Sequence, residues 1–271
     1  MKFTQSDLKK LWRPKEDSSG EDNGQVTIIG GSSLFHGAPM LAVKAASRLV
    51  DMVFFGSPER MLEKVAKQNS FIWVPWEDVE SYIAKSDAVL IGPGLMRYRK
   101  NLPEKVFDEA GTETKMLTKY WLERFPNKQW VIDGGSLQVM HPSWVPQNAI
   151  LTPNKKEFEL MFKVQGSVFN TKKIAKKYNC VIVYKGPVAY VTDGEILYEI
   201  GGGNAGLTKG GTGDVLAGVI TGLAAKNPPL LAAAAGTYVL KKAAEKLFLK
   251  KGYGYNADDL AESIVIPAYF P

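Results

Sequence analysis

A glycine-rich segment at residues 201–214 carries the clearest chemistry in the sequence. Five glycines fall between Gly203 and Gly213, Asp214 follows them, and an apolar helical run begins at once. Glycines before a helix let several backbone N–H groups converge on one point, and the helix N-terminus adds positive potential there. A phosphate group is favoured at such a point, and a neighbouring carboxylate could take the proton of a substrate hydroxyl. The spacing therefore predicts a nucleotide phosphate over residues 210–214, with Asp214 as the reactive group.

The simplest alternative is that Asp214 only caps the helix, because Asp is a common capping residue. A cap requires one side chain, whereas each glycine held in a fixed conformation costs about 0.5–1 kcal/mol relative to alanine. The glycines therefore favour a ligand that approaches the backbone closely. The loop is not a Walker sequence, because the Gly-Lys-Ser/Thr ending is absent.

Short apolar segments that alternate with helical stretches must position this loop. Glycines cluster where several of these segments end, as at Gly30-Gly31, Gly92-Pro93-Gly94 and Gly134-Gly135. This alternation is typical of βαβ units with a parallel sheet buried on both faces, and ligands bind outside the carboxyl ends of such strands. The predicted strands span residues 25–29, 52–55, 71–74, 88–91, 130–133, 149–151 and 180–184.

Two further elements follow from local patterns. The turn Asp193-Gly194 lies between residues 188–192 and 196–200, and predicts a late antiparallel hairpin. Apolar residues at helical spacing predict a helix at residues 39–50.

The N-terminal region is predicted to precede the domain and to pack on its body or on a partner subunit. A short helix at about residues 6–12 precedes a polar linker at residues 13–24. We therefore divide the chain into residues 1–24 and a domain at residues 25–271.

Composition and charge argue against several classes of function. The net charge is +6, from 34 basic and 28 acidic residues, and 45% of the residues are hydrophobic, which is ordinary for a globular protein. Lysine pairs such as Lys241-Lys242 have helical spacing and predict solvated helix faces, and no basic block with interleaved aromatics indicates nucleic-acid binding. No apolar run reaches the ~18 residues of a membrane helix, and no signal peptide is visible. We expect a cytoplasmic protein with no membrane partner, and a buried thiol at Cys180.

Several motifs occur in a characteristic order along the chain. They are Gly30-Gly31-Ser32-Ser33, Gly37-Ala38-Pro39, Ile91-Gly92-Pro93-Gly94-Leu95, Val131-Ile132-Asp133, Leu151-Thr152-Pro153 with Glu157, Lys185-Gly186, Asn204 and Gly206 before Gly210-Gly211-Thr212-Gly213-Asp214-Val215-Leu216-Ala217-Gly218, and Asp258-Asp259-Leu260 with Ile266-Pro267. Together they resemble the ribokinase-like NAD(P)H-hydrate dehydratases over about residues 25–267. The resemblance implies a three-layer α/β/α fold with a mostly parallel central sheet and a late antiparallel hairpin.

The resemblance also implies repair of NADH or NADPH to which water has added across a ring double bond. ADP or ATP would phosphorylate the ring hydroxyl, Asp214 would take its proton, and phosphate would then leave. Backbone N–H groups near Gly211, Thr212 and Gly213 would form the anion hole, and Mg²⁺ would bridge the phosphates with Glu157 as an indirect contact. The nucleotide would contact Lys185, Gly186, Pro187, Val188, Ala189, Asn204 and Gly213. The hydrate would contact Ala38, Gly94, Asn154 and Asp214.

Three departures from the family's usual pattern leave the substrate open. Asn154 stands where the family often has His, and with Glu157 it resembles the Asn-x-x-Glu motif of ribokinase-type kinases. Gly134 stands where a second acid is frequent, and Met96 where Gly is frequent. A small-molecule kinase acting on a vitamin-precursor alcohol is therefore one alternative, and a non-catalytic nucleotide-binding protein is another.

Three residue roles also stay open. Asp133 is either a site acid or the cap of the next helix, and Glu157 is either a metal-water contact or a first-turn helix acid. Lys185 either binds phosphate or lies on a turn. We also expect a homo-oligomer, with the N-terminal helix and residues 39–55 as candidate contact surfaces.

Overall fold

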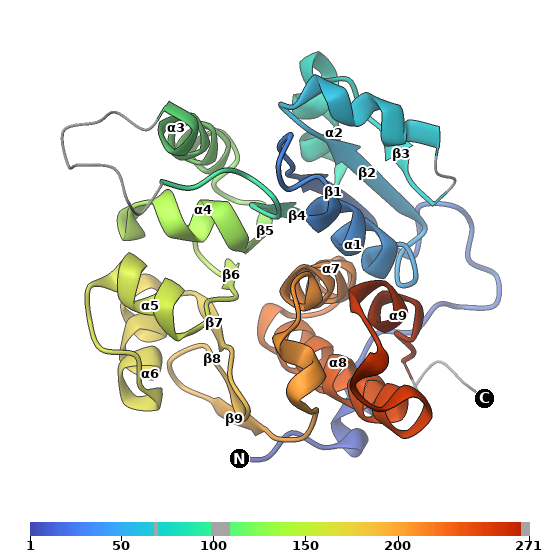
Figure 1. Cartoon of the computed structure of the whole chain (residues 1–271), viewed down its shortest axis with the longest axis vertical. Coiled ribbons are helices and arrows are strands. Elements are labelled where there is room, and N and C mark those ends of the chain that lie inside the picture. Colours follow the sequence, from blue (N-terminus) through green and yellow to red (C-terminus); the bar gives the residue numbers. More distant parts are fainter. Residues whose placement is uncertain (68–69, 99–108, 267–271) are drawn as a thin grey trace.

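The computed structural model describes residues 1–67, 70–98 and 109–266, and within them nine strands form one sheet (Figure 1). The strand order is β3-β2-β1-β4-β5-β6-β7-β8-β9. All pairs are parallel except β7–β8 and β8–β9, which are antiparallel. The strands are β1 (Gln25–Ile29), β2 (Met52–Gly56), β3 (Ile72–Trp73), β4 (Ala88–Ile91), β5 (Gln129–Ile132), β6 (Ile150–Leu151), β7 (Val181–Tyr184), β8 (Ala189–Thr192) and β9 (Leu197–Ile200).

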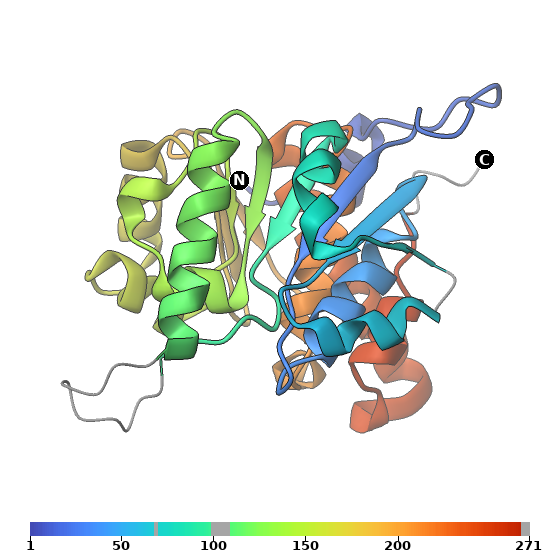
Figure 2. The ribbon, with the colours of Figure 1, turned by 90° about the horizontal axis from the view of Figure 1, so that it is seen from above.

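Helices cover both faces of the sheet (Figure 2). Successive strand residues point to opposite faces, so Ile28 packs in the core with α1, α7 and α8, whereas Ile29 packs in a second core with α2, α3 and α5. The α-helices are α1 (Gly37–Ala46), α2 (Val79–Lys85), α3 (Glu109–Arg124), α4 (Gly134–Val139), α5 (Lys155–Phe162), α6 (Val168–Tyr178), α7 (Thr212–Ala224), α8 (Pro229–Lys251) and α9 (Ala257–Glu262). Short 3-10 helices are η1 (Gln5–Lys10), η2 (Arg60–Lys67), η3 (Trp76–Asp78), η4 (Pro142–Trp144), η5 (Ala205–Thr208) and η6 (Gly252–Gly254).

This architecture confirms the predicted three-layer fold and its late hairpin. The strands β1 and β4 have the predicted bounds, and most others differ by a residue at an end. The largest difference is β3, which keeps only Ile72–Trp73 because it is an edge strand paired with β2 alone.

Two predicted helices are present with different bounds. The helix predicted at residues 39–50 ends at Ala46, since the N–H of Leu49 bonds to the Ala46 carbonyl in a tight turn that leads into β2. The N-terminal helix predicted at about residues 6–12 is present as the 3-10 helix η1, at Gln5–Lys10. The N–H of the C-cap residue Leu11 bonds to the Leu8 carbonyl, and both leucines are buried in the core.

The N-terminal segment is packed onto the body. Phe3 is buried in the core, and Lys2 pairs with Glu199 of the edge strand β9.

Cys180 is buried as predicted, and burial raises its pKa to about 12. The prediction of a solvated face for Lys241-Lys242 is wrong for Lys241, which is only 5% exposed. In the described part of the chain, no helix combines the length and apolar character needed to span a bilayer.

Candidate functional site

A cavity of about 370 Å³ lies where the parallel strands end at their carboxyl edge. Its walls come from the segments after β1, β4, β5, β6 and β7 and from the loop before α7. This is the position at which open α/β sheets bind ligands. The cavity brings together most of the predicted site residues: Ala38, Gly94, Asn154, Glu157, Lys185, Gly211, Gly213 and Asp214.

The loop at the start of α7 can form only with glycine at one position. Gly211 is the N-cap and has a φ of +91°, in the left-handed region. A Cβ there would lie 2.4 Å from Cδ1 of Leu41 and 2.8 Å from Cβ of Ala257. Both the backbone angle and the crowding therefore exclude a side chain. The glycine brings the loop backbone close against α1 and α9, with the mouth of α7 open to the cavity.

Thr212 holds this loop in place. Its buried hydroxyl donates to the carbonyls of Leu207 at 2.7 Å and Lys209 at 2.9 Å, and its N–H bonds to Lys209 at 3.4 Å. A helix leaves its first N–H groups without intrahelical partners. The hydroxyl and the N–H of Thr212 are thus used to hold the loop. The neighbouring residue Gly213 lines the cavity, and its amide lies at the helix N-terminus, where an anion would bind.

Asp214 lies in the first turn of α7 and lines the cavity. The N-cap of α7 is Gly211, which has no side chain, so Asp214 is not the N-cap residue; its carboxylate accepts from its own backbone N–H and also lines the cavity. Burial raises the pKa of Asp214 to about 7, assisted by the negative charge of Asp133, although Lys185 opposes the shift. A carboxylate with a pKa near neutrality is suited to general-base chemistry.

Asp133, Lys185 and Glu157 form a charged group in the cavity wall. The Lys185 Nζ lies 3.1 Å from Oδ1 of Asp133 and 3.6 Å from Oε2 of Glu157. Burial alone would lower the pKa of Lys185, but the two carboxylates outweigh it and raise the pKa. The Lys185 ammonium therefore stays charged beside Asp214.

Asp133 is a cavity acid at the N-cap position of α4, but its side chain does not cap that helix. It precedes α4 but makes no side-chain cap hydrogen bond. Its Oδ1 instead accepts from Oγ1 of Thr152 at 2.7 Å and from Lys185. The open choice for Asp133 is thus decided by partners that lie 19 and 52 residues further along the chain.

Asn154 and Glu157 form a capping box at the start of α5. The Asn154 Oδ1 accepts from the N–H of Glu157 at 3.0 Å, and Oε2 of Glu157 accepts from the N–H of Asn154 at 2.8 Å. Such reciprocal bonds satisfy two helix-end donors. Glu157 is therefore a first-turn helix acid, and it also lines the cavity. Within the described residues no group of three His, Cys, Asp or Glu side chains is arranged to hold a metal.

Several predicted residues lie outside the cavity lining. They are Thr212, Gly186, Pro187, Val188, Ala189 and Asn204. The Asn204 side chain is used within the protein, because its Oδ1 accepts from the N–H of Gly206 and from the Tyr255 hydroxyl, and its Nδ2 donates to the Ala244 carbonyl.

Three cavity residues were not found from the sequence: Phe35, Arg97 and Gln138. The Arg97 guanidinium lies 5.9 Å from the centre of the Phe35 ring, and Nη1 donates to Oε1 of Gln138 at 3.4 Å. The one local signal was the position of Arg97, two residues after the Gly-Pro-Gly-Leu turn.

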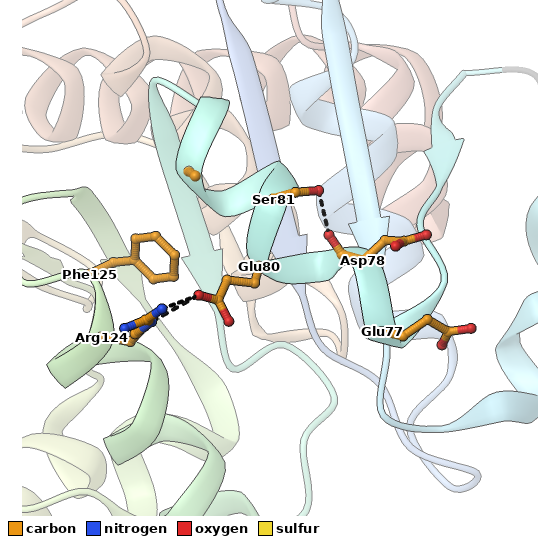
Figure 3. A pocket seen from close by; sticks show the side chains of 7 residues that line it. Glu77, Asp78, Glu80, Ser81, Arg124 and Phe125 are labelled. Carbon is orange, nitrogen blue, oxygen red and sulfur yellow. Dashed lines mark hydrogen bonds and ion pairs between the residues drawn. The ribbon is translucent and has the colours of Figure 1, made fainter.

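A second depression, of about 500 Å³, lies between α2 and α3 and shares no residue with this cavity (Figure 3). Its charged side chains are partly paired on the surface, since Arg124 Nη2 lies 2.7 Å from Oε1 of Glu80. The Ser81 hydroxyl donates to the Asp78 carbonyl. It lacks the buried acid and the glycine loop of the first cavity, and we assign it no chemistry.

Comparison with known proteins gives a consistent result. A family model described as NAD(P)H-hydrate dehydratase matches residues 26–265. A bifunctional NAD(P)H-hydrate repair enzyme of Methanocaldococcus jannaschii is 35% identical over 269 residues, which is 95% of this chain and 50% of the relative. The ADP-dependent (S)-NAD(P)H-hydrate dehydratase of Cenarchaeum symbiosum is 27% identical over 92% of this chain and 89% of its own length. The chain thus spans about half the length of the first of these relatives.

A similar solved structure is the ADP/ATP-dependent NAD(P)H-hydrate dehydratase of Bacillus subtilis, co-crystallised with ATP and Mg²⁺. Its TM-score is 0.78 at 22% identity, and the match covers 97% of this chain and 95% of that one. At this identity the likeness establishes the fold.

Proposed function

Because the chain belongs to the NAD(P)H-hydrate dehydratase family, we propose that it removes water from hydrated NADH or NADPH, with ADP or ATP as the phosphoryl donor. It would then be a carbon–oxygen lyase. The ADP-dependent relative from Cenarchaeum symbiosum supports the use of a nucleotide. We also propose a cytoplasmic location, and a homo-oligomer stays a prediction.

The observation that carries the proposal is Asp214 beside the glycine loop at the mouth of α7. As the ring hydroxyl attacks the terminal phosphorus of the donor, Asp214 takes its proton; an O–P bond forms and the donor's bridging P–O bond breaks. The C–O bond then breaks, and phosphate leaves with its electron pair. A proton leaves the adjacent ring carbon, and the ring double bond is restored. A pKa of about 7 suits Asp214 to the first proton transfer.

The backbone around Gly211 and Gly213 supports the phosphoryl group in this scheme, because preorganised N–H groups stabilise charge that develops on it. Magnesium would neutralise phosphate charge when bound. Mg²⁺ commonly keeps waters and phosphate oxygens beside one or two carboxylates. Glu157 in the cavity wall suits such a contact through water.

The remaining contacts are proposed from the family pattern. We place the AMP part of the nucleotide on residues 185–189, with Asn204 and Gly213. We place the hydrated ring against Ala38, Gly94 and Asn154, beside Asp214.

The kinase alternative depended on Asn154 and Glu157. Their reciprocal hydrogen bonds are those of a helix capping box, so the pair has a local explanation that requires no kinase. The family match also favours the dehydratase. We therefore retain one proposed function.

The test is to incubate the protein with hydrated NADH or NADPH and with ADP or ATP, and to follow the absorbance of the reduced nicotinamide. We expect it to return only with nucleotide, and the Asp214→Asn variant to be slower by roughly 10²–10⁴-fold. Asp17→Asn, at an exposed acid of the N-terminal segment, is the matched control. No return of absorbance with the wild type, or full activity in Asp214→Asn, would refute the proposal.

A further inference from the structure

Lys241 is a buried cation that no motif explains. It lies on α8 with 5% exposure, and its Nζ donates to the carbonyls of Pro187 at 2.7 Å, Gly202 at 3.0 Å and Gly186 at 3.4 Å. Over the described residues, no carboxylate oxygen lies within 4.0 Å of its Nζ. Burial lowers the pKa of Lys241. A buried charge is costly unless its hydrogen bonds are satisfied. We therefore expect the bonds from Lys241 to hold the backbone segments that carry these carbonyls.

The carbonyls belong to two loops that are far apart in the sequence. One is the β7–β8 turn, at residues 185–188, and the other is the loop after β9, at residues 201–204. The strands β7 and β9 both pair antiparallel to β8. They therefore run in the same direction, and both loops lie at the carboxyl edge of the sheet.

Glu245, one turn further along α8, binds the loop after β9 as well. Its Oε1 accepts from the N–H of Gly203 at 2.9 Å, and its Oε2 pairs with Nζ of Lys242 at 2.7 Å. Gly203 has a φ of +77°, and its Cα faces the Lys241 stem, since a Cβ there would lie 3.3 Å from Cγ of Lys241. One face of α8 thus holds both loops.

The orientation of one peptide group follows from this contact. In a trans peptide the C=O and the next N–H point in opposite directions. Because Lys241 binds the Pro187 carbonyl, the N–H of Val188 points away from Lys241, and Val188 is 38% exposed.

We propose that Lys241 is a positioning residue for the nucleotide: by binding carbonyls of both loops, it fixes the spacing of the two walls that hold the AMP part. This inference rests on the proposed function, which places the AMP part on residues 185–189 and Asn204. Lys241 does not touch the reacting atoms, so it acts on nucleotide affinity and not on the chemical step.

The test compares Lys241→Met with Lys246→Met, which removes an exposed ammonium from the same helix. Calorimetric titration with ADP and steady-state kinetics are measured on both variants and the wild type. We expect the Kd and the KM for ADP to rise about tenfold or more in Lys241→Met, the loss expected when hydrogen bonds to a charged group are removed. The kcat at saturating ADP and the KM for the hydrate should stay within about twofold of wild type, as should all values of Lys246→Met.

Hydrogen–deuterium exchange on the wild type provides a second measurement that does not depend on the folding of a variant. ADP should slow amide exchange in residues 186–189 and in residues 201–204 together. Unchanged ADP affinity in folded Lys241→Met would overturn the inference alone, whereas ADP binding that protects neither loop would also refute the placement of the AMP part on residues 185–189. A wild type that binds neither ADP nor ATP would refute the proposed function as well.

Discussion

Replacing Asp214 by Asn removes a negative charge that destabilises the folded protein. Asp214 is mostly buried in the cavity wall, and burial and the charge of Asp133 raise its pKa from 3.8 to about 7. Asn has nearly the same shape and no charge. The variant therefore tests the electrostatics of the site without a change in packing.

The size of the effect follows from this pKa. The pKa of Asp214 in the folded protein lies about three units above its ordinary value, and each unit corresponds to about 1.36 kcal/mol. Keeping Asp214 ionised in the folded protein therefore lowers the free energy of unfolding by up to ~4 kcal/mol. Because the folded-state pKa is the higher one, the folded protein binds the proton more tightly. The stabilising contribution is complete below pH 3.8 and is lost as the pH rises through about 7. Asp214→Asn should thus gain stability relative to wild type as the pH rises.

The assay is thermal and urea unfolding of both proteins at pH 5 and pH 8. For 271 residues, an unfolding entropy of about 2.1 cal/mol/K per residue converts ~4 kcal/mol into a Tm difference of about 7 °C. Only the part of the contribution lost between pH 5 and about 7 separates the two conditions, about two pH units, so we expect the variant's advantage to be larger at pH 8 than at pH 5 by up to about 2.7 kcal/mol, or about 5 °C in Tm. Asp17→Asn should show no such change. An Asp214→Asn advantage that is equal at both pH values would refute the account of the site, since Asp214 would then carry no electrostatic penalty.

Three further predictions test other parts of the structure. Asp133→Asn should move the acid limb of the kcat/KM profile to lower pH, because it removes a charge that raises the pKa of Asp214; an unmoved limb would contradict this. Gly211→Ala should destabilise the protein by about 1–3 kcal/mol in urea unfolding, whereas Gly210→Ala, where a Cβ meets nothing within 4 Å, should be nearly neutral. The thiol of Cys180, with a pKa of about 12, should react with a thiol reagent at pH 8 only after unfolding, and rapid labelling of the native protein would argue against its burial.

Much of the site could be predicted because its determinants are local. The glycines before α7, and Asp214 after them, fall within about a dozen residues, and their types require a tight loop whatever the rest of the chain does. The hairpin of β8 and β9 is local in the same sense, since Asp193 Oδ1 accepts the N–H groups of Glu195 and Ile196 within its own turn. The alternation of strands and helices could be predicted for the same reason, because the spacing of apolar residues within a short segment separates a helix from a buried strand.

The limits of prediction appear where a residue's role depends on a distant partner. Lysines 241 and 242 are neighbours with one helical pattern, yet only Lys241 faces the carbonyls of two loops. Arg97 reaches the cavity mouth through the fold, beside Phe35 from another loop. Nothing near either residue in the sequence encodes these contacts.

The sequence by itself determined the order of strands and helices, the glycine loop and its acid, because backbone freedom and hydrophobic period are properties of neighbouring residues. Only the tertiary structure decided that Asp133 and Lys185 lie together beside that acid and that Lys241 is buried. Burial and charge at a site are sums over segments that the folded sheet brings to one edge, and no single segment contains them.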